Sequence, residues 1–277
     1  MKRGRIILTT AGAAVIAAVF GGAWWLRSLT PLPRGEDLAL STQVLDRNGG
    51  LLRAYATPEG RWRLPAQVAD VDPRLIEMLL AYEDKRFRGH AGVDPLAMLR
   101  AAAQWVLNAR VISGGSTITM QVARLLEPRA DRTLGAKLRQ MVRALELERR
   151  LDKDEVLALY LTLAPYGGNL EGVRAASLAY FGREPNRLTL GEAALLVALP
   201  QSPEARRPDR SAMTARQARD RVLDRMEGRI PADGIPAPAV GRRAAPLRRA
   251  RGGAAPCQNR RAKRRARLRD CRHKARA

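Results

Sequence analysis

The most constraining feature of this chain is a helix start at Asp72-Pro73 followed by an apolar stripe that ends on a carboxylate. Aspartate at a helix cap and proline at the first helical position are strong start signals. Leu75 and Leu79 are spaced as on one buried helix face, and the next residue at this spacing is Glu83. A carboxylate in register with a buried face is partly desolvated, which raises its proton affinity. The pattern is typical of a general base, although a helix end with solvated charges fits this stretch equally well.

A second informative stretch begins at Gly114-Gly115-Ser116. The two glycines free the backbone and Ser116 can cap a new helix, whose unpaired N–H groups favour phosphate. The buried face of this helix is predicted to hold Ile118, Val122, Leu125 and Leu126, and its polar stripe to hold Thr117, Gln121 and Arg124. A plain loop and helix cap is the alternative interpretation. A nucleotide-binding phosphate loop is excluded, because no Gly-Lys-Ser/Thr sequence is present.

The remaining signals from Asp72 onward are helical. Asp94-Pro95 repeats the helix start, and it precedes apolar residues at helical spacing, namely Leu96, Leu99, Ala103 and Leu107. Two pairs have the spacing of capping boxes, Asp152 with Glu155 and Thr189 with Glu192. Before them, two short apolar runs flank Asn48-Gly49, which predicts a β-hairpin. We therefore expect a mainly α fold with a short hairpin region.

The N-terminus has the pattern of a membrane anchor. Lys2, Arg3 and Arg5 precede an uncharged run of 21 residues, Ile6 to Leu26, which as a helix would cross the hydrocarbon core of a bilayer. The positive flank predicts a cytoplasmic N-terminus and a body on the other side of the membrane. A cleaved signal peptide is the competing interpretation, but the run is long for one and no small-residue cleavage site follows it.

The C-terminal segment differs in composition from the rest. The chain carries a formal net charge of +23, and residues 229–277 hold sixteen Lys or Arg against Asp233 and Asp270. Both cysteines, Cys257 and Cys271, also lie there. The segment has no apolar periodicity, so we expect a disordered basic tail, of the kind that a shifted reading frame would produce. Attraction to anionic lipid is expected rather than nucleic-acid binding, because the tail would lie outside the membrane.

The residues between about Leu38 and Gly228 resemble the peptidoglycan glycosyltransferases, glycosyltransferase family 51, whose five motifs occur here in order. The matching residues are Glu83-Asp84-Lys85-Arg86-Phe87 with His90 and Gly92-Val93-Asp94-Pro95; Gly114-Gly115-Ser116-Thr117-Ile118-Thr119 with Gln121; Leu147-Glu148, Asp152-Lys153-Asp154-Glu155-Val156-Leu157 and Tyr160-Leu161; Tyr166-Gly167, Gly172-Val173, Ala175-Ala176 and Tyr180-Phe181-Gly182; and Leu188-Thr189-Leu190, Glu192-Ala193-Ala194-Leu195-Leu196 and Leu199-Pro200-Gln201-Ser202-Pro203.

This resemblance implies a lysozyme-like fold and a membrane-anchored enzyme that extends glycan chains from lipid II outside the cytoplasmic membrane. By motif position, Glu83 would be the base that deprotonates the acceptor 4-hydroxyl, and undecaprenyl pyrophosphate would leave with inversion. The residues implied to bind substrate are Asp84, Phe87, His90, Ser116, Thr117, Gln121, Arg124, Lys137 and Gln140. Departure of the pyrophosphate requires cations, hydrogen-bond donors or a metal such as Mg²⁺. Arg124 and Lys137 are the candidate cations, and no protein metal ligand is assigned.

Several positions depart from the family pattern. Gln140 stands where the third motif usually has a second glutamate, and Ala136 stands where an arginine is usual. Glutamine cannot carry charge or accept a proton, so a mechanism that needs two carboxylates is in doubt. Arg124 replaces a lysine, which keeps the charge but changes the hydrogen-bond geometry. Leu125 and Thr162 each replace an asparagine.

The sequence thus predicts four segments: a cytoplasmic flank and anchor at 1–29, a spacer with the hairpin at 30–71, the glycosyltransferase domain at 72–228 and the tail at 229–277. The Ser-x-x-Lys, Ser-x-Asn and Lys-Thr-Gly motifs of a penicillin-binding transpeptidase are absent from the sequence, so we expect no cross-linking activity. Two functions remain open: a lipid II polymerase, and a catalytically weak anchored protein that binds lipid II or other cell-wall synthases. A hydrolase of similar fold is a third.

Overall fold

The structure is a computed structural model that describes residues 21, 32–33, 37–108, 115–127 and 133–226. Within these residues, no helix has the length and apolar character needed to cross a membrane. Apart from Gly21, the predicted anchor at 1–29 lies outside the described residues, as does the basic tail at 229–277. Both therefore remain predictions from the sequence.

Most of the described chain is helical, which confirms the mainly α prediction. The α-helices are α2 (Pro73–Glu83), α3 (Pro95–Asn108), α4 (Ile118–Leu126), α5 (Leu134–Glu148), α6 (Lys153–Leu163), α7 (Val173–Phe181), α8 (Leu190–Ala198) and α9 (Ala212–Met226). Short 3-10 helices are η2 (Val68–Asp70), η3 (Phe87–Gly89) and η4 (Leu199–Gln201). The lysozyme-like arrangement implied by the resemblance stays a prediction.

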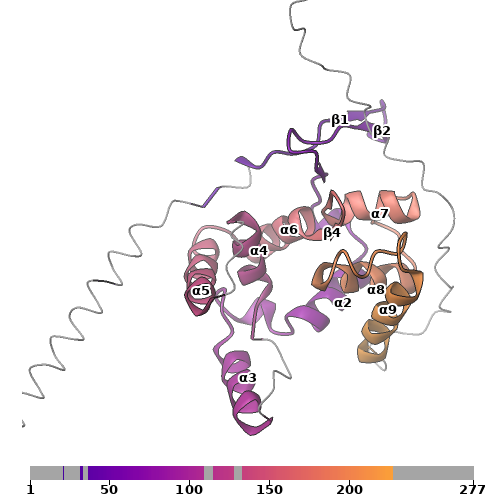
Figure 1. Cartoon of the computed structure of the whole chain (residues 1–277). Coiled ribbons are helices and arrows are strands. Elements are labelled where there is room, and N and C mark those ends of the chain that lie inside the picture. Colours follow the sequence, from indigo (N-terminus) through magenta and orange to yellow (C-terminus); the bar gives the residue numbers. More distant parts are fainter. Residues whose placement is uncertain (1–20, 22–31, 34–36, 109–114, 128–132, 227–277) are drawn as a thin grey trace, which may run out of the picture.

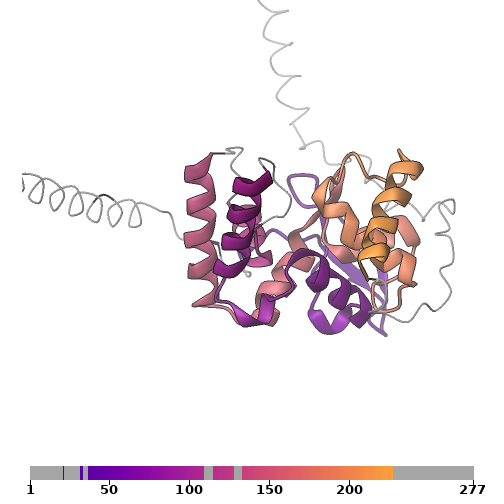
Figure 2. The same ribbon diagram turned by 90° about the horizontal axis from the view of Figure 1, so that it is seen from below.

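The helices form two groups joined by α6 (Figures 1 and 2). One group consists of α4 packed against α5, and the other of α2 packed against α8 and α9. We call them the α4–α5 group and the α2–α8–α9 group. Helix α6 contacts α4 and α5 on one side and α7 on the other. The helix α2 ends at Glu83, so its C-terminus points a carboxylate toward the junction of the two groups.

The helix starts follow the predicted caps. The Asp72 carboxylate accepts hydrogen bonds from Arg74 N at 3.0 Å and from Leu188 N at 3.0 Å, so it caps α2 and also ties it to the loop before α8. Asp94 accepts from Ala97 N at 2.9 Å at the start of α3. Both predicted capping boxes, those of α6 and α8, are present. These local predictions are confirmed.

The strands are few and short. The strands β1 (Gln43–Leu45) and β2 (Leu51–Ala54) pair antiparallel, which confirms the predicted hairpin. Asp46 closes its turn by accepting from Asn48 N and Gly50 N, and Gly49 adopts φ +81°, which favours glycine. In a second sheet, β5 (Leu170–Glu171) lies between β3 (Trp62–Arg63), to which it is parallel, and β4 (Pro165–Gly167), to which it is antiparallel.

The predicted spacer shares its core with the helices. Leu32 is 6% exposed and Ala66 is 1% exposed, and both belong to the apolar cluster that also contains Leu75 and Leu161. Contacts of this kind stabilise a domain by burying apolar surface. A chain shortened to begin near Leu38 would therefore lose a core side chain, Leu32. The segment bounds at residues 30–71 and 72–228 stay predictions from the sequence.

Candidate active site

Glu83 lies between the two helix groups and is held by one amide from each. Its Oε2 accepts a hydrogen bond from Gln121 Nε2 on α4 at 2.9 Å, and its Oε1 accepts from Gln201 Nε2 at the end of η4 at 2.7 Å. The side chain is half-buried, as the register with Leu75 and Leu79 predicts. These two donors, one on each oxygen, fix the plane of the carboxylate. Each oxygen retains a second lone pair that can take a proton.

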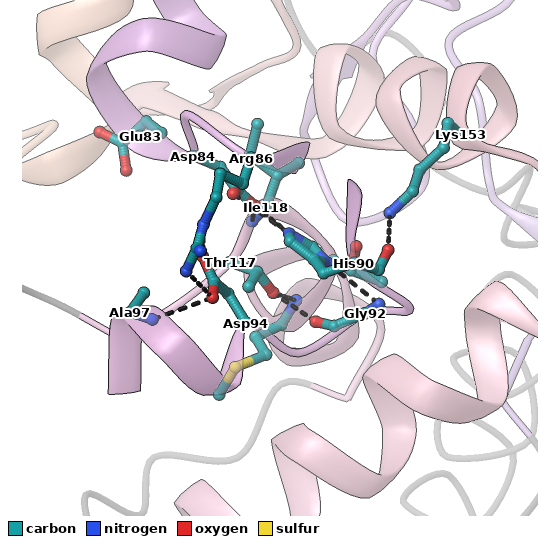
Figure 3. Close-up of polar contacts among 12 residues, drawn as sticks. Glu83, Asp84, Arg86, His90, Gly92, Asp94, Ala97, Thr117, Ile118 and Lys153 are labelled. Atoms are coloured by element: carbon teal, nitrogen blue, oxygen red, sulfur yellow. Dashed lines mark hydrogen bonds and ion pairs between the residues drawn. The ribbon is translucent and has the colours of Figure 1, made fainter. Parts of the chain in front are cut away.

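Asp84 points the opposite way, into the protein (Figure 3). The chain leaves the helix at this residue, and the Asp84 carboxylate is buried. It accepts hydrogen bonds from His90 Nε2 at 3.1 Å and from Ile118 N at 3.0 Å. Ile118 is the first residue of α4. Because Gly92 N–H donates to His90 Nδ1 at 3.2 Å, this nitrogen is the acceptor, and the protonated Nε2 donates a hydrogen bond to Asp84. Asp84 and His90 thus position α4 beneath the site.

The helix α4 begins one residue later than the Ser116 cap predicts. Its N-cap is Thr117, whose hydroxyl accepts from Met120 N at 3.1 Å and donates to Gly92 O at 2.5 Å. Thr117 is 2% exposed, so it does not share an accessible stripe with Gln121 and Arg124. The cap prediction at Ser116 is therefore wrong by one residue. The reason is that the Thr117 hydroxyl is drawn inward by the Gly92 carbonyl.

Phe87 lies under the same loop. It is 1% exposed, and the ammonium of Lys153 lies 4.6 Å from its ring centroid. Lys153 Nζ also donates to His90 O and to Glu148 Oε1, each at 2.6 Å. The loop that follows Glu83 is therefore tied to α5 and α6. The assignment of Asp84, Phe87, His90 and Thr117 to substrate stays a prediction, and their burial favours a positioning role.

A cationic cluster lies across α4 and α5. Lys137 donates to the Ser116 hydroxyl, which brings these two predicted residues together. Burial, and secondarily the charge of Arg124, lower the pKa of the Lys137 ammonium. Arg124, Arg139 and Gln140 line one small pocket between the two helices, together with Arg143 and its ion-pair partner Glu127. This concentration of positive charge on the α4–α5 group suits an anion, because a bound phosphate would relieve the mutual repulsion of Lys137 and Arg124.

These side chains do not fit a magnesium ion held by the protein. Magnesium prefers oxygen ligands, mostly carboxylates and water, whereas the cluster presents ammonium and guanidinium groups. Among the described residues, no three His, Cys, Asp or Glu side chains gather as a metal site. The magnesium candidate stays a prediction, which polymerisation assays with and without a chelator would test.

Tyr160 on α6 is a buried neighbour of the site that sequence reasoning did not assign. It is 1% exposed, and its hydroxyl has no hydrogen-bond partner within the described part of the chain. Burial raises the pKa of this hydroxyl well above its usual range, and the negative charge of Glu83 adds to the effect. A buried hydroxyl without a protein partner commonly bonds an ordered water. The sequence placed Tyr160 among the family motif residues but indicated no role for it beyond an aromatic residue on an apolar helix.

Gln201 was the other unassigned residue at this site. The sequence placed it in the fifth motif without a role, and its contact with Glu83 joins residues 118 positions apart. A local sequence pattern cannot predict a contact between residues so far apart in the chain. The structure thus brings Glu83 together with Gln121 and Gln201, and Ser116 together with Lys137. Arg124 and Gln140 meet at the small pocket between α4 and α5.

Comparison with known families gives a match over most of the described chain. The family model described as Transglycosylase matches residues 48–227. Penicillin-binding protein 1C of Escherichia coli K12 is 48% identical over 214 residues, which cover 77% of this chain and 28% of that protein. The sequence runs at residues 110–113, 120–126 and 137–140 predict this likeness, which the comparison confirms.

Penicillin-binding protein 1A of Haemophilus influenzae is 42% identical over 226 residues, covering 82% of this chain and 26% of that protein. A crystal structure under the same name and organism has 23% identity and a TM-score of 0.34, and it covers 68% of this chain and 18% of that one. The chain spans about a quarter of the length of these relatives.

Proposed function

This chain belongs to the transglycosylase family, and from that premise we propose that its helical domain is a peptidoglycan glycosyltransferase that polymerises lipid II. One observation carries the proposal. A carboxylate with free lone pairs is held at the junction of the helix groups, and a cationic cluster lies on the neighbouring α4–α5 group. Transfer of a sugar from a diphosphate needs a base for the acceptor and positive charge for the leaving group.

In the proposed reaction, Glu83 removes the proton of the acceptor sugar's 4-hydroxyl. The acceptor oxygen then attacks the anomeric carbon of the lipid-linked glycan from the side opposite the diphosphate, so the configuration inverts. The bond from this carbon to the diphosphate oxygen breaks, and undecaprenyl pyrophosphate leaves. Arg124 and Lys137 stabilise the charge that develops on its oxygens, and Ser116 orients Lys137. Gln140 lies beside Arg124 as a neutral hydrogen-bonding group.

The proposed substrate is membrane-bound, and the exposed face of α3 suits a lipid surface. Leu96, Leu99 and Leu107 are 60, 69 and 82% exposed, respectively, although their spacing is that of an amphipathic helix. Large apolar side chains gathered on one exposed helix indicate contact with an apolar partner. We propose that α3 lies against the outer leaflet of the bacterial cytoplasmic membrane. We also propose that the predicted anchor at residues 1–29 holds the chain in this membrane. The proposed partners are the growing glycan and other cell-wall synthases.

We expect that replacing Leu96, Leu99 and Leu107 together by serine weakens vesicle adsorption of a chain beginning at Thr30 by roughly tenfold or more, since each exposed leucine would lose its burial in lipid. The melting temperature should hold, because these side chains are exposed already. Co-sedimentation with vesicles measures the effect. Met213→Ser on α9, where the side chain is 66% exposed, is the matched control and should leave adsorption unchanged. Equal losses in both variants would contradict a role for α3.

A second candidate is a catalytically weak protein that binds lipid II or a partner synthase, and Gln140 is the observation that favours it. Incubation of the detergent-solubilised full chain with labelled lipid II separates the candidates. Glycan polymer on a gel supports the polymerase, and binding without polymer supports the binding protein. Shortening of pre-formed glycan would instead indicate a hydrolase.

A further inference from the structure

Gln201 is oriented by a second residue, Arg206. One guanidinium nitrogen of Arg206, Nη1, donates to Gln201 Oε1 at 3.1 Å and to Ala198 O at 2.6 Å. A guanidinium can only donate, so the amide oxygen of Gln201 must face Arg206 and its NH₂ must face Glu83. The direction of the Gln201–Glu83 hydrogen bond is therefore fixed by the neighbouring turn and does not depend on the Glu83 charge alone.

Gln201 contributes little to the packing of the fold. Its side chain is exposed, whereas Leu199, two residues earlier in η4, is fully buried. The helix η4 directly continues α8, so buried Leu199 gives exposed Gln201 a rigid base. The Gln201 amide is thus exposed, is oriented by Arg206 and donates to the half-buried carboxylate of Glu83. Side chains that hold a reactive group in position have this arrangement.

We propose that Gln201 is a positioning residue for Glu83, with Arg206 fixing the orientation of its amide. The inference rests on the proposed function of Glu83 as the base. Gln201 holds Oε1 from the α2–α8–α9 group while Gln121 holds Oε2 from the α4–α5 group, so the carboxylate is aligned across the junction. The amide NH₂ of Gln201 donates to the carboxylate and cannot take the proton itself, which leaves the free lone pairs of Glu83 as the acceptors.

Other charged or titratable groups around Glu83 make contacts that do not include Gln201. Besides burial, the charge of Glu83 raises the pKa of the Tyr160 hydroxyl on α6, and the charge of Arg124 on α4 lowers it. Arg225 on α9 lies 5.0 Å from the ring centroid of Tyr82, the residue before Glu83. Since none of these contacts involves Gln201, a change at this position isolates its effect on the carboxylate.

The test compares Gln201→Ala, Gln201→Glu and Arg206→Gln in the full chain in detergent. We expect Gln201→Ala to lower kcat for lipid II polymerisation by roughly ten- to a hundredfold with KM nearly unchanged, because a misaligned base slows only the chemical step. Gln201→Glu places a second carboxylate beside Glu83, so the acid limb of the pH–rate profile should move up by roughly one pH unit or more. Arg206→Gln should fall between wild type and Gln201→Ala.

Arg210→Ala is the matched control. It removes a 67% exposed arginine from the same turn whose ion pair is with Glu204, and it should leave kcat and the pH profile unchanged. Melting temperatures should agree within a degree or two for the Gln201 variants, because the side chain is exposed. A raised KM with unchanged kcat in Gln201→Ala would show that Gln201 binds substrate instead, and it would overturn the proposal. Unchanged kinetics and pH profile would do the same.

A readout without turnover separates this inference from the proposed function. In protein carrying ¹³C at the glutamate carboxyl carbons, the Glu83 signal is the one lost in Glu83→Gln, and its chemical shift can be followed by NMR. We expect this chemical shift at fixed pH to change in Gln201→Ala and not in Arg210→Ala, since one hydrogen-bond donor to the carboxylate is lost. An unchanged chemical shift in Gln201→Ala overturns the inference even if lipid II is polymerised. If the chemical shift changes in Gln201→Ala but the wild-type protein makes no polymer, only the proposed function is overturned.

Discussion

Glu83→Gln is expected to lower lipid II polymerisation by roughly a thousandfold or more while leaving lipid II binding within a few-fold. The substitution keeps the shape of the side chain and removes its capacity to accept a proton, and a positioned general base typically contributes about 10²- to 10⁴-fold to the rate. The new amide can keep its oxygen toward the NH₂ of Gln201, which Arg206 holds in position, and turn its own NH₂ toward Gln121. The loss of activity is therefore expected from the missing base and not from a misplaced side chain.

Polymerisation and binding are measured on the same samples, by gel analysis of labelled lipid II and by equilibrium binding. The melting temperature should change little, because Glu83 is only half-buried and its partner Gln121 can rotate its amide. Gln201→Ala serves as a comparison, since it removes one support of the base but not the base. Polymerisation at near wild-type rate in Glu83→Gln would remove Glu83 from the mechanism.

Asp84→Ala is expected to act on the fold, although it changes the adjacent residue. The substitution leaves His90 Nε2–H and Ile118 N–H buried without their acceptor. At about 1 to 3 kcal/mol for each unsatisfied donor, the free energy of unfolding should fall by roughly 3 kcal/mol, with a melting temperature lower by on the order of 10 °C. Polymerisation should fall as well, because α4, which begins at Ile118, carries Gln121.

Thermal and denaturant unfolding measure this effect. Asp154→Ala is the matched control, since Asp154 and its partner Arg88 have side chains 59% and 57% exposed and such pairs contribute at most about 1 kcal/mol. Asp84→Asn keeps one acceptor oxygen and should be intermediate. If Asp84→Ala lost activity with unchanged stability, Asp84 would contact substrate rather than support α4.

The contrast between Glu83 and Asp84 shows what could be predicted from the sequence. Helix starts at Asp72, Asp94, Asp152 and Thr189 were predictable because a cap and its helix are close in the chain. The register of Glu83 with Leu75 and Leu79 was predictable for the same reason. The opposite directions of the two carboxylates depend on the backbone leaving the helix at Asp84, where φ is −154° and ψ is 79°. An acidic pair at a helix end carries no signal for that turn.

Contacts between distant segments were not predictable from local patterns. Gln201 reaches Glu83 only because α8 packs on α2, and Asp84 reaches Ile118 across 34 residues. For α3 the local pattern was informative but incomplete. Leucines at helical spacing predict an apolar face, but they do not indicate what covers this face. The family resemblance supplied the site residues, and the structure separates those facing the junction from those that support it.

The most direct test of the proposed function is the product of the wild-type protein acting on lipid II labelled in its disaccharide and in its lipid. The proposal predicts a glycan with inverted configuration at each new linkage, and one undecaprenyl pyrophosphate released for each disaccharide added. Both are measured on one sample, the linkage by NMR of the purified glycan and the diphosphate by chromatography. Release of the diphosphate together with free disaccharide, or a glycan with retained configuration, would contradict it.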